Sequence, residues 1–377
     1  MKIAEWLTYS SIEHLKRLRS FYCPTSESDP HSKYSLIRTI ISQLDNAEKQ
    51  GALVSQCSEH ERAFLELLFL DPAPSFTMEE LLGKGRVAIR GADKNPRSLV
   101  IQALSKGWIF PGYTAKTQGL YFIPSDLKQQ MIANLVIPYF QEPLLRPPQT
   151  YRDEENQLVN DLLIFLRFLQ REVVKLTNEG SIYKQQQKKL FQSFVIPEEP
   201  LNRSGPRFGF GRSYHLYPDR FSLVYDYALY QGYFIEDQSD SIRLTEYGLG
   251  KVRNREISDG EALYRFWLRL YRRPIPQLPI IVRWIAMISE AGWVDTAVLY
   301  QAVQSWFSPY YYETKENLYQ KTLQMMLHLG MIRLGMENEK QYLSLTSSGR
   351  AWLKHDSLFQ LKVIEEEFTR RGAKYLH

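Results

Sequence analysis

Leu229-Tyr-Gln-Gly-Tyr-Phe-Ile235 ends an apolar, helix-like run with a glycine and leads directly into a hydrophobic stretch. Leu104-Ser-Lys-Gly-Trp-Ile109 and Leu327-His-Leu-Gly-Met-Ile332 repeat this pattern. In all three copies a polar segment and a second apolar stretch follow, and the second stretch closes on Thr or Ser. Glycine can end a helix in the left-handed conformation, and two apolar stretches around a polar tip predict a β-hairpin. The three copies therefore predict a tandem array of helix-plus-hairpin modules.

Helix, glycine, strand, tip and strand is the order of the second half of a winged helix. We expect the fold to be mainly α with small β-hairpin wings (α+β), built as tandem winged-helix domains after an N-terminal helical hairpin. The predicted boundaries are 1–50 for the helical hairpin, 58–137 for winged helix one, 138–150 for a proline-rich linker, 151–257 for winged helix two, 258–355 for winged helix three and 356–377 for a C-terminal helix. We expect Gly83 and Gly85 to stop the second helix of winged helix one, and the linker to lack regular structure.

Length and composition fit a globular protein of two or three domains, with 377 residues, 44% hydrophobic and 24% charged. The net charge of +5 is compatible with an acidic partner. Cys23 and Cys57 lack metal-ligand spacing, and we expect them to stay reduced in the cytosol. No signal peptide and no membrane span are expected, so the predicted localisation is cytoplasmic.

Two short amphipathic helices are predicted before the first module. Ser11 is a candidate N-cap for one, and the other begins near Ser32. This hairpin resembles the SAP-type motif, whose second helix begins with Lys-x-x-Leu-Ile, here Lys33-Tyr-Ser-Leu-Ile37. The alternative is a hairpin that only docks against the following domain.

The string Leu176-Thr-x-x-Gly-x-Ile-Tyr-Lys184 precedes a basic helix. Together with the wing of domain one, it resembles bacterial helicase-associated proteins whose winged helices are related to the N-terminal region of the XPB helicase. The likeness covers about residues 11 to 255 and implies a role near DNA, in repair or transcription. A motor is not expected, because the string Gly205-Pro-Arg-Phe-Gly-Phe-Gly211 has one residue too many for a P-loop and is followed by Arg instead of Lys.

The loop from Arg203 to Arg220 alternates arginines with aromatic residues. Guanidinium groups suit phosphates, and exposed rings stack on unpaired bases. The alternative is a flexible loop whose rings enter the core and whose arginines are solvated. The residues predicted to contact nucleic acid are Arg97, Lys106 and Lys116 in winged helix one, Lys184, Lys188 and Lys189 in the basic helix, and Arg203, Arg207, Phe208, Phe210, Arg212, Tyr214 and Arg220 in the loop.

No catalytic, metal or cofactor site is predicted, since the chain has neither a His-x-x-x-His pair nor a Cys-x-x-Cys pair. We expect a non-catalytic DNA-binding or helicase-associated accessory protein, with DNA and a helicase or other DNA-processing protein as partners and no membrane. The alternatives are an interaction scaffold that does not touch DNA and, more weakly, a transcriptional regulator. DNA binding predicts that the third helices, Pro96–Lys106, Asp219–Gln231 and Thr314–Leu329, border a positive surface. A scaffold predicts that neighbouring domains cover them.

Overall fold

The structure is a computed structural model that describes residues 1–24, 32–91, 94–202, 207–237, 240–254, 258–354 and 364. The chain forms two compact units, Met1–Phe140 and Gln141–His377. Its described part is mainly helical, with three small antiparallel sheets, which confirms the predicted α+β class. Among the described helices, none has both the length and the apolar character needed to cross a bilayer.

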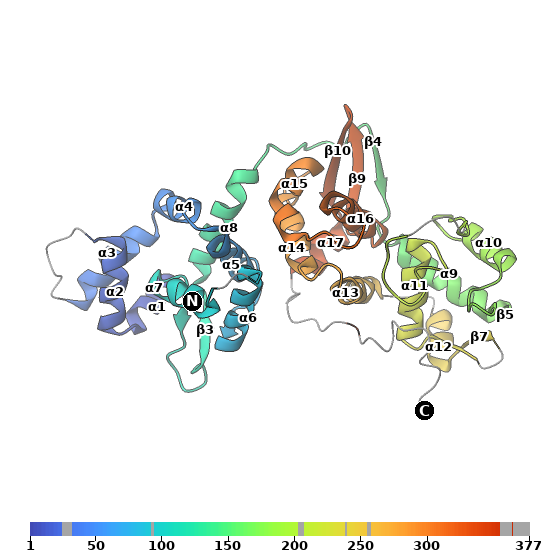
Figure 1. Ribbon diagram of the computed structural model, residues 1–377, viewed down its shortest axis with the longest axis horizontal. Coiled ribbons are helices and arrows are strands. Elements are labelled where there is room, and N and C mark those ends of the chain that lie inside the picture. The colour runs from blue at the N-terminus through green and yellow to red at the C-terminus, as the bar shows by residue number, and fades with distance from the viewer. Residues whose placement is uncertain are drawn as a thin grey trace. The chain divides into compact units, whose positions relative to one another are not determined.

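The first unit packs eight α-helices of its described part around a three-stranded sheet of order β1-β3-β2 (Figure 1). Helix α2 begins at the predicted cap, where the Ser11 hydroxyl accepts from a backbone N–H, and Ser32 caps α3 in the same way. The elements are α1 (Ile3–Tyr9), α2 (Ile12–Tyr22), α3 (Lys33–Leu44), α4 (Ala47–Ser55), α5 (Glu59–Phe69), β1 (Ser75–Thr77), α6 (Met78–Ile89), α7 (Pro96–Ser105), β2 (Phe110–Pro111), β3 (Leu120–Phe122), α8 (Ser125–Val136) and the 3-10 helix η1 (Ile137–Tyr139).

The second unit holds two sheets, of order β5-β7-β6 and β4-β9-β10-β8. Its elements are β4 (Thr150–Asp153), α9 (Gln157–Arg171), β5 (Val174–Lys175), α10 (Lys184–Gln192), α11 (Asp219–Tyr230), β6 (Phe234–Glu236), β7 (Ser241–Leu244), α12 (Glu246–Asn254), α13 (Gly260–Tyr271), α14 (Leu278–Ile288), β8 (Val294–Asp295), α15 (Thr296–Val303), the 3-10 helix η2 (Gln304–Trp306), α16 (Lys315–His328), β9 (Ile332–Glu337), β10 (Lys340–Leu345) and α17 (Ser347–Lys354). In Figure 1, β4 lies beside β9, although more than 170 residues separate them in the chain.

One order of elements occurs three times: helix, short strand, two helices, hairpin. The copies are α5-β1-α6-α7-β2-β3, α9-β5-α10-α11-β6-β7 and α14-β8-α15-α16-β9-β10. In each copy the second strand of the hairpin lies between the first strand of the hairpin and the short strand that follows the first helix. The sheet thereby ties the start of each copy to its end.

A left-handed glycine ends the last helix before each hairpin, as predicted. Gly107, Gly232 and Gly330 have φ angles of 68°, 68° and 70°. In each copy the N–H of the following residue donates over 2.9 Å to a carbonyl five residues earlier, closing the helix end in a Schellman motif. The hairpins β2–β3, β6–β7 and β9–β10 are antiparallel, which confirms the predicted strand pairs.

The expected helix stop at Gly83 and Gly85 is wrong. Helix α6 runs through Gly83 and Gly85 to Ile89, because Gly85 provides space for the next helix: a Cβ there would lie 3.0 Å from Pro96. The segment 138–150 lacks helix and strand over 140–149, as predicted, apart from a single bridge between Leu144 and Trp293; η1 overlaps its beginning and β4 begins at its end. Apart from Ile364, the predicted C-terminal helix 356–377 lies outside the described residues.

Replacing Gly330 by alanine should destabilise the fold strongly. Its φ of 70° disfavours a side chain, and the new Cβ would lie 2.8 Å from the Glu154 carbonyl oxygen. The two penalties together predict a loss of about 2–4 kcal/mol in the free energy of unfolding, measured by urea denaturation. Gly250→Ala is the control: it lies inside α12 with open space around it and should be neutral or slightly stabilising. Equal effects of the two substitutions would contradict this account.

Candidate nucleic-acid interface

The three helices that precede the hairpins differ in how much surface they expose. Nine of the twelve residues of α11 and eight of the fourteen residues of α16 are buried. In α7 only Leu99, Val100 and Ala103 are buried among ten residues. Among these three described helices, α7 therefore has the widest exposed face.

The exposed face of α7 combines charge, hydroxyls and one apolar side chain. Arg97, Ile101 and Ser105 follow each other at helical spacing, and Ser98 lies beside them. Ile101 is 56% exposed, although it is a large aliphatic residue. We define the α7 face as Arg97, Ser98, Ile101 and Ser105.

The local sequence fixes where α7 begins and how it packs. The side chain of Asn95 accepts from the N–H of Arg97 over 2.9 Å, and Pro96 occupies the first turn. Close packing of Pro96 on Gly85 sets the crossing of α6 and α7. A groove of about 230 Å³ lies beside the start of α7, lined in part by His60, Lys94 and Gln102.

The residues of the first unit that were predicted to contact nucleic acid differ in whether they are free to bind it. Arg97 and Lys116 are exposed, and Lys116 lies on the tip between β2 and β3. Lys106 is half-buried, and its ammonium lies 3.3 Å from a Glu61 carboxylate oxygen and 4.6 Å from the centre of the Trp108 ring. Lys106 therefore already has an anionic partner within its own unit.

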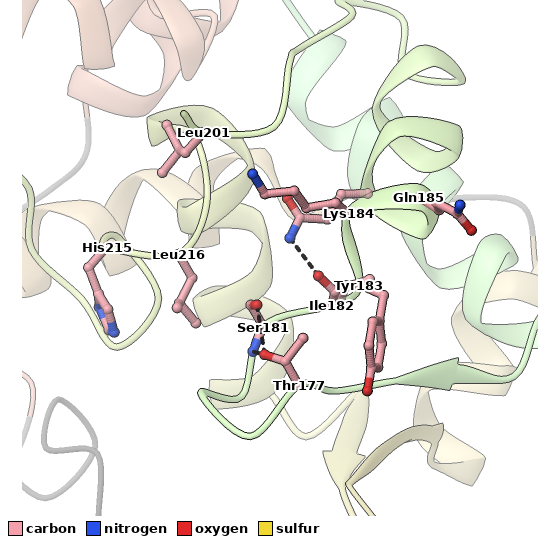
Figure 2. A pocket seen from close by; sticks show the side chains of 10 residues that line it. Thr177, Ser181, Ile182, Tyr183, Lys184, Gln185, Leu201, His215 and Leu216 are labelled. Atoms are coloured by element: carbon pink, nitrogen blue, oxygen red, sulfur yellow. Dashed lines mark hydrogen bonds between the residues drawn. The ribbon is translucent and has the colours of Figure 1, made fainter. Parts of the chain in front are cut away.

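Helix α10 in the second unit presents a basic face next to a pocket. Lys184 and Lys188 are exposed one turn apart, whereas the third predicted lysine, Lys189, pairs with Glu172 over 2.6 Å. The pocket has a volume of about 510 Å³. Figure 2 shows the Lys184 side chain reaching towards Leu201 across the pocket, while Gln185 points away from it.

Most polar and aromatic groups of the predicted binding loop are engaged internally. Arg207 donates to the carbonyl oxygens of Tyr214 and Tyr217 over 2.9 and 3.0 Å and pairs with Asp219. Arg212 pairs with Glu236. Arg207 and Arg212 are thus paired rather than solvated, which neither interpretation of the loop expected.

The loop aromatics pack against the third copy. The rings of Phe208 and Phe210 lie 6.3 and 5.6 Å from that of Tyr310, and Lys321 lies over Phe208 at 4.7 Å. Tyr214 is half-buried. Arg203 lies outside the described residues. The interpretation in which rings enter the core therefore describes this loop better than exposed stacking does.

Arg220 is the clearest correction among the predicted contacts. Its side chain is only 2% exposed, with Nε 3.0 Å from Glu154 and an ion pair to Asp161. His328 Nδ1 lies 3.0 Å from the same Glu154 oxygen. Because internal partners enclose the Arg220 guanidinium, it is not accessible to a phosphate.

Positively charged neighbours counteract the effect of burial on Glu154. Burial alone would raise the pKa of Glu154, but the hydrogen bond from His328 and the charges of His328, Arg220 and Arg152 hold it below its usual value. Sequence reasoning missed this cluster, because its members come from three segments far apart in the chain, around Glu154, Arg220 and His328, and share no motif. Within the described residues, no group of three His, Cys, Asp or Glu side chains is placed to hold a metal ion.

Comparison with models of known protein families, with curated proteins and with solved structures found no match. The functional conclusion therefore depends on the geometry of the chain itself.

Glu198 should make the stability of the second unit depend on pH. Burial raises its pKa from 4.5 to about 8 despite the opposing charge of Arg220, and Asp161 and Asp219 add to the rise. Because the folded carboxyl binds its proton more tightly than the unfolded one, its stabilisation is complete below about pH 4.5 and is lost as pH rises through about 8.

We expect Glu198→Gln, which stays neutral, to be more stable than the wild type at about pH 9 by roughly 1–3 kcal/mol and to show a flatter pH profile in urea denaturation. Glu199→Gln, at the exposed neighbouring position, should follow the wild-type profile. A Glu198→Gln profile parallel to the wild type would refute the assignment.

Proposed function

We propose that this chain is a non-catalytic, DNA-binding accessory protein built from three tandem winged helices, acting in DNA repair or transcription. The repeated order of helix, strand, two helices and hairpin supports the winged-helix assignment, as does the sheet order shared by all copies. In this architecture the helix before the hairpin is the one that enters the major groove, and the hairpin tip lies near the backbone.

The single observation that carries the DNA-binding proposal is the open α7 face. Arg97 offers donors for base edges or phosphates, and Ile101 offers an apolar contact of the kind that suits a thymine methyl group. The hydroxyls of Ser98 and Ser105 donate to the carbonyl oxygens of Asn95 and Gln102 and offer acceptors. Lys116 on the neighbouring tip adds a phosphate contact. We therefore assign duplex binding to the first unit.

The burial of α11 and α16 favours a second candidate function, that of a protein-interaction scaffold. In the second unit α11 is mostly covered, and α16 exposes a face on which Glu316, Asn317 and Gln320 lie, without an arginine. The acidic Glu236 on the first hairpin of this unit is held by Arg212 and by the Tyr225 hydroxyl, at 2.9 Å from the latter. On the scaffold hypothesis, the second unit docks a helicase or another DNA-processing protein.

Fluorescence anisotropy with a labelled DNA duplex over a salt series tests the first proposal. We expect Arg97→Ala/Lys116→Ala to bind the duplex about tenfold or more weakly. The slope of log K against log salt concentration should fall by about 1.8, which corresponds to the loss of two phosphate contacts. Lys49→Ala removes an exposed charge from α4 and should leave binding unchanged.

Absence of duplex binding by the wild type at low salt would reject the DNA-binding proposal and leave the scaffold in its place. Wild-type affinity in the double variant would instead remove α7 and the neighbouring tip from the interface.

A further inference from the structure

We infer that the pocket at the beginning of α10 binds one nucleotide of an unpaired strand, with the base on its apolar floor and the phosphate on Lys184. This inference deepens the proposed function and rests on it, because it assigns a single-stranded ligand to the second unit. The pocket uses none of the residues of the α7 face.

The size and the floor of the pocket suit a base and its sugar. Its volume of about 510 Å³ falls within the range of small-molecule sites. Leu201 and Leu216 are half-buried and contribute apolar surface, and the fully buried Ile182 lies behind them. Figure 2 shows Leu201 and Leu216 on one side of the pocket and Ser181 and Thr177 on another. A flat base can lie against the leucine side, and the side with the two hydroxyls offers polar groups to its edge.

Internal hydrogen bonds hold the lining in place before any ligand arrives. The hydroxyls of Thr177 and Ser181 lie 3.0 Å apart. The N–H of Ile182 donates to the Tyr217 hydroxyl over 2.9 Å, and the buried amide of Gln187 donates to the Ile182 carbonyl over 2.6 Å. A fixed lining reduces the entropy that binding would otherwise cost.

The charge distribution identifies the ligand as an anion with an extended backbone. Lys184 and Lys188 lie one turn apart on the exposed side of α10, and neither has an ion-pair partner among the described residues. Two lysines at this spacing can follow successive phosphates. Tyr183, half of whose surface is exposed, borders the same pocket and offers a ring to the next base.

A base can enter the pocket only when it is not paired, because a base inside a duplex is held by its partner and by the stacked bases on either side. The same chemistry would also accept a free nucleoside monophosphate. We assign the pocket to a single strand rather than to a free nucleotide, since Lys188 lies beyond the pocket and contributes to binding only if the ligand continues along α10.

The test is anisotropy of a labelled oligo-dT with the full chain, with unlabelled dTMP as competitor and the DNA duplex measured in parallel. We expect Lys184→Gln/Lys188→Gln to weaken oligo-dT binding and to lower its salt slope by about 1.4. Leu216→Trp fills the pocket and should weaken oligo-dT binding about tenfold, which is the expected effect of losing one stacked base. Lys340→Gln, exposed at the start of β10, is the control and should change neither.

Duplex affinity should stay at the wild-type level in all of these variants, because duplex binding belongs to α7. Weak competition by dTMP supports the strand, whereas dTMP binding as tightly as the oligonucleotide overturns the assignment to a strand in favour of a free nucleotide. Wild-type oligo-dT affinity in both pocket variants overturns the inference even if the duplex proposal holds. If neither form of DNA binds at low salt, the proposed function fails as well.

Discussion

The return of the chain at the end of each third helix is the constraint on which the rest of the structure depends. A residue in the left-handed conformation must stand there so that the following strand can run back and pair within its own copy. In the second unit a threonine reinforces this return: Thr245 and Thr346 each donate a hydroxyl to the carbonyl of the helix-ending glycine over 2.7 Å. The same hydroxyls accept from the N–H of Gly248 and Gly349 in the next helix.

Local chemistry explains why sequence reasoning found these modules and missed other features. A glycine at a helix end, flanked by apolar stretches, forms a pattern that can be recognised within about twenty residues of sequence. The pairing of β4 with β9 and the ion pair between Glu154 and Arg220 join residues far apart in the chain, and no local pattern encodes them. The prediction that Gly85 ends a helix was wrong for a related reason, because the role of Gly85 is set by the approach of Pro96 rather than by its own helix.

The candidate sites show the same division. Exposed lysines on α10 and Arg97 on α7 follow from polar residues at helical spacing. The arginines of the loop before α11 look equally basic in sequence, but the fold supplies each described one with a carboxylate. Composition therefore locates basic residues, whereas only tertiary structure decides which of them retain an unneutralised charge. The three copies share an architecture and differ in which surface remains open.

The buried carboxylate of Glu154 affects how the second unit unfolds. One oxygen of this fully buried carboxylate is within hydrogen-bond distance of both Arg220, on α11, and His328, on α16. Separating the second copy from the third would break the contact of Glu154 with one of these helices, so the carboxylate couples the two copies. The repeat visible in the sequence is thus not a unit of folding: the two copies should melt in a single calorimetric transition, and a fragment cut between them should not be stable by itself.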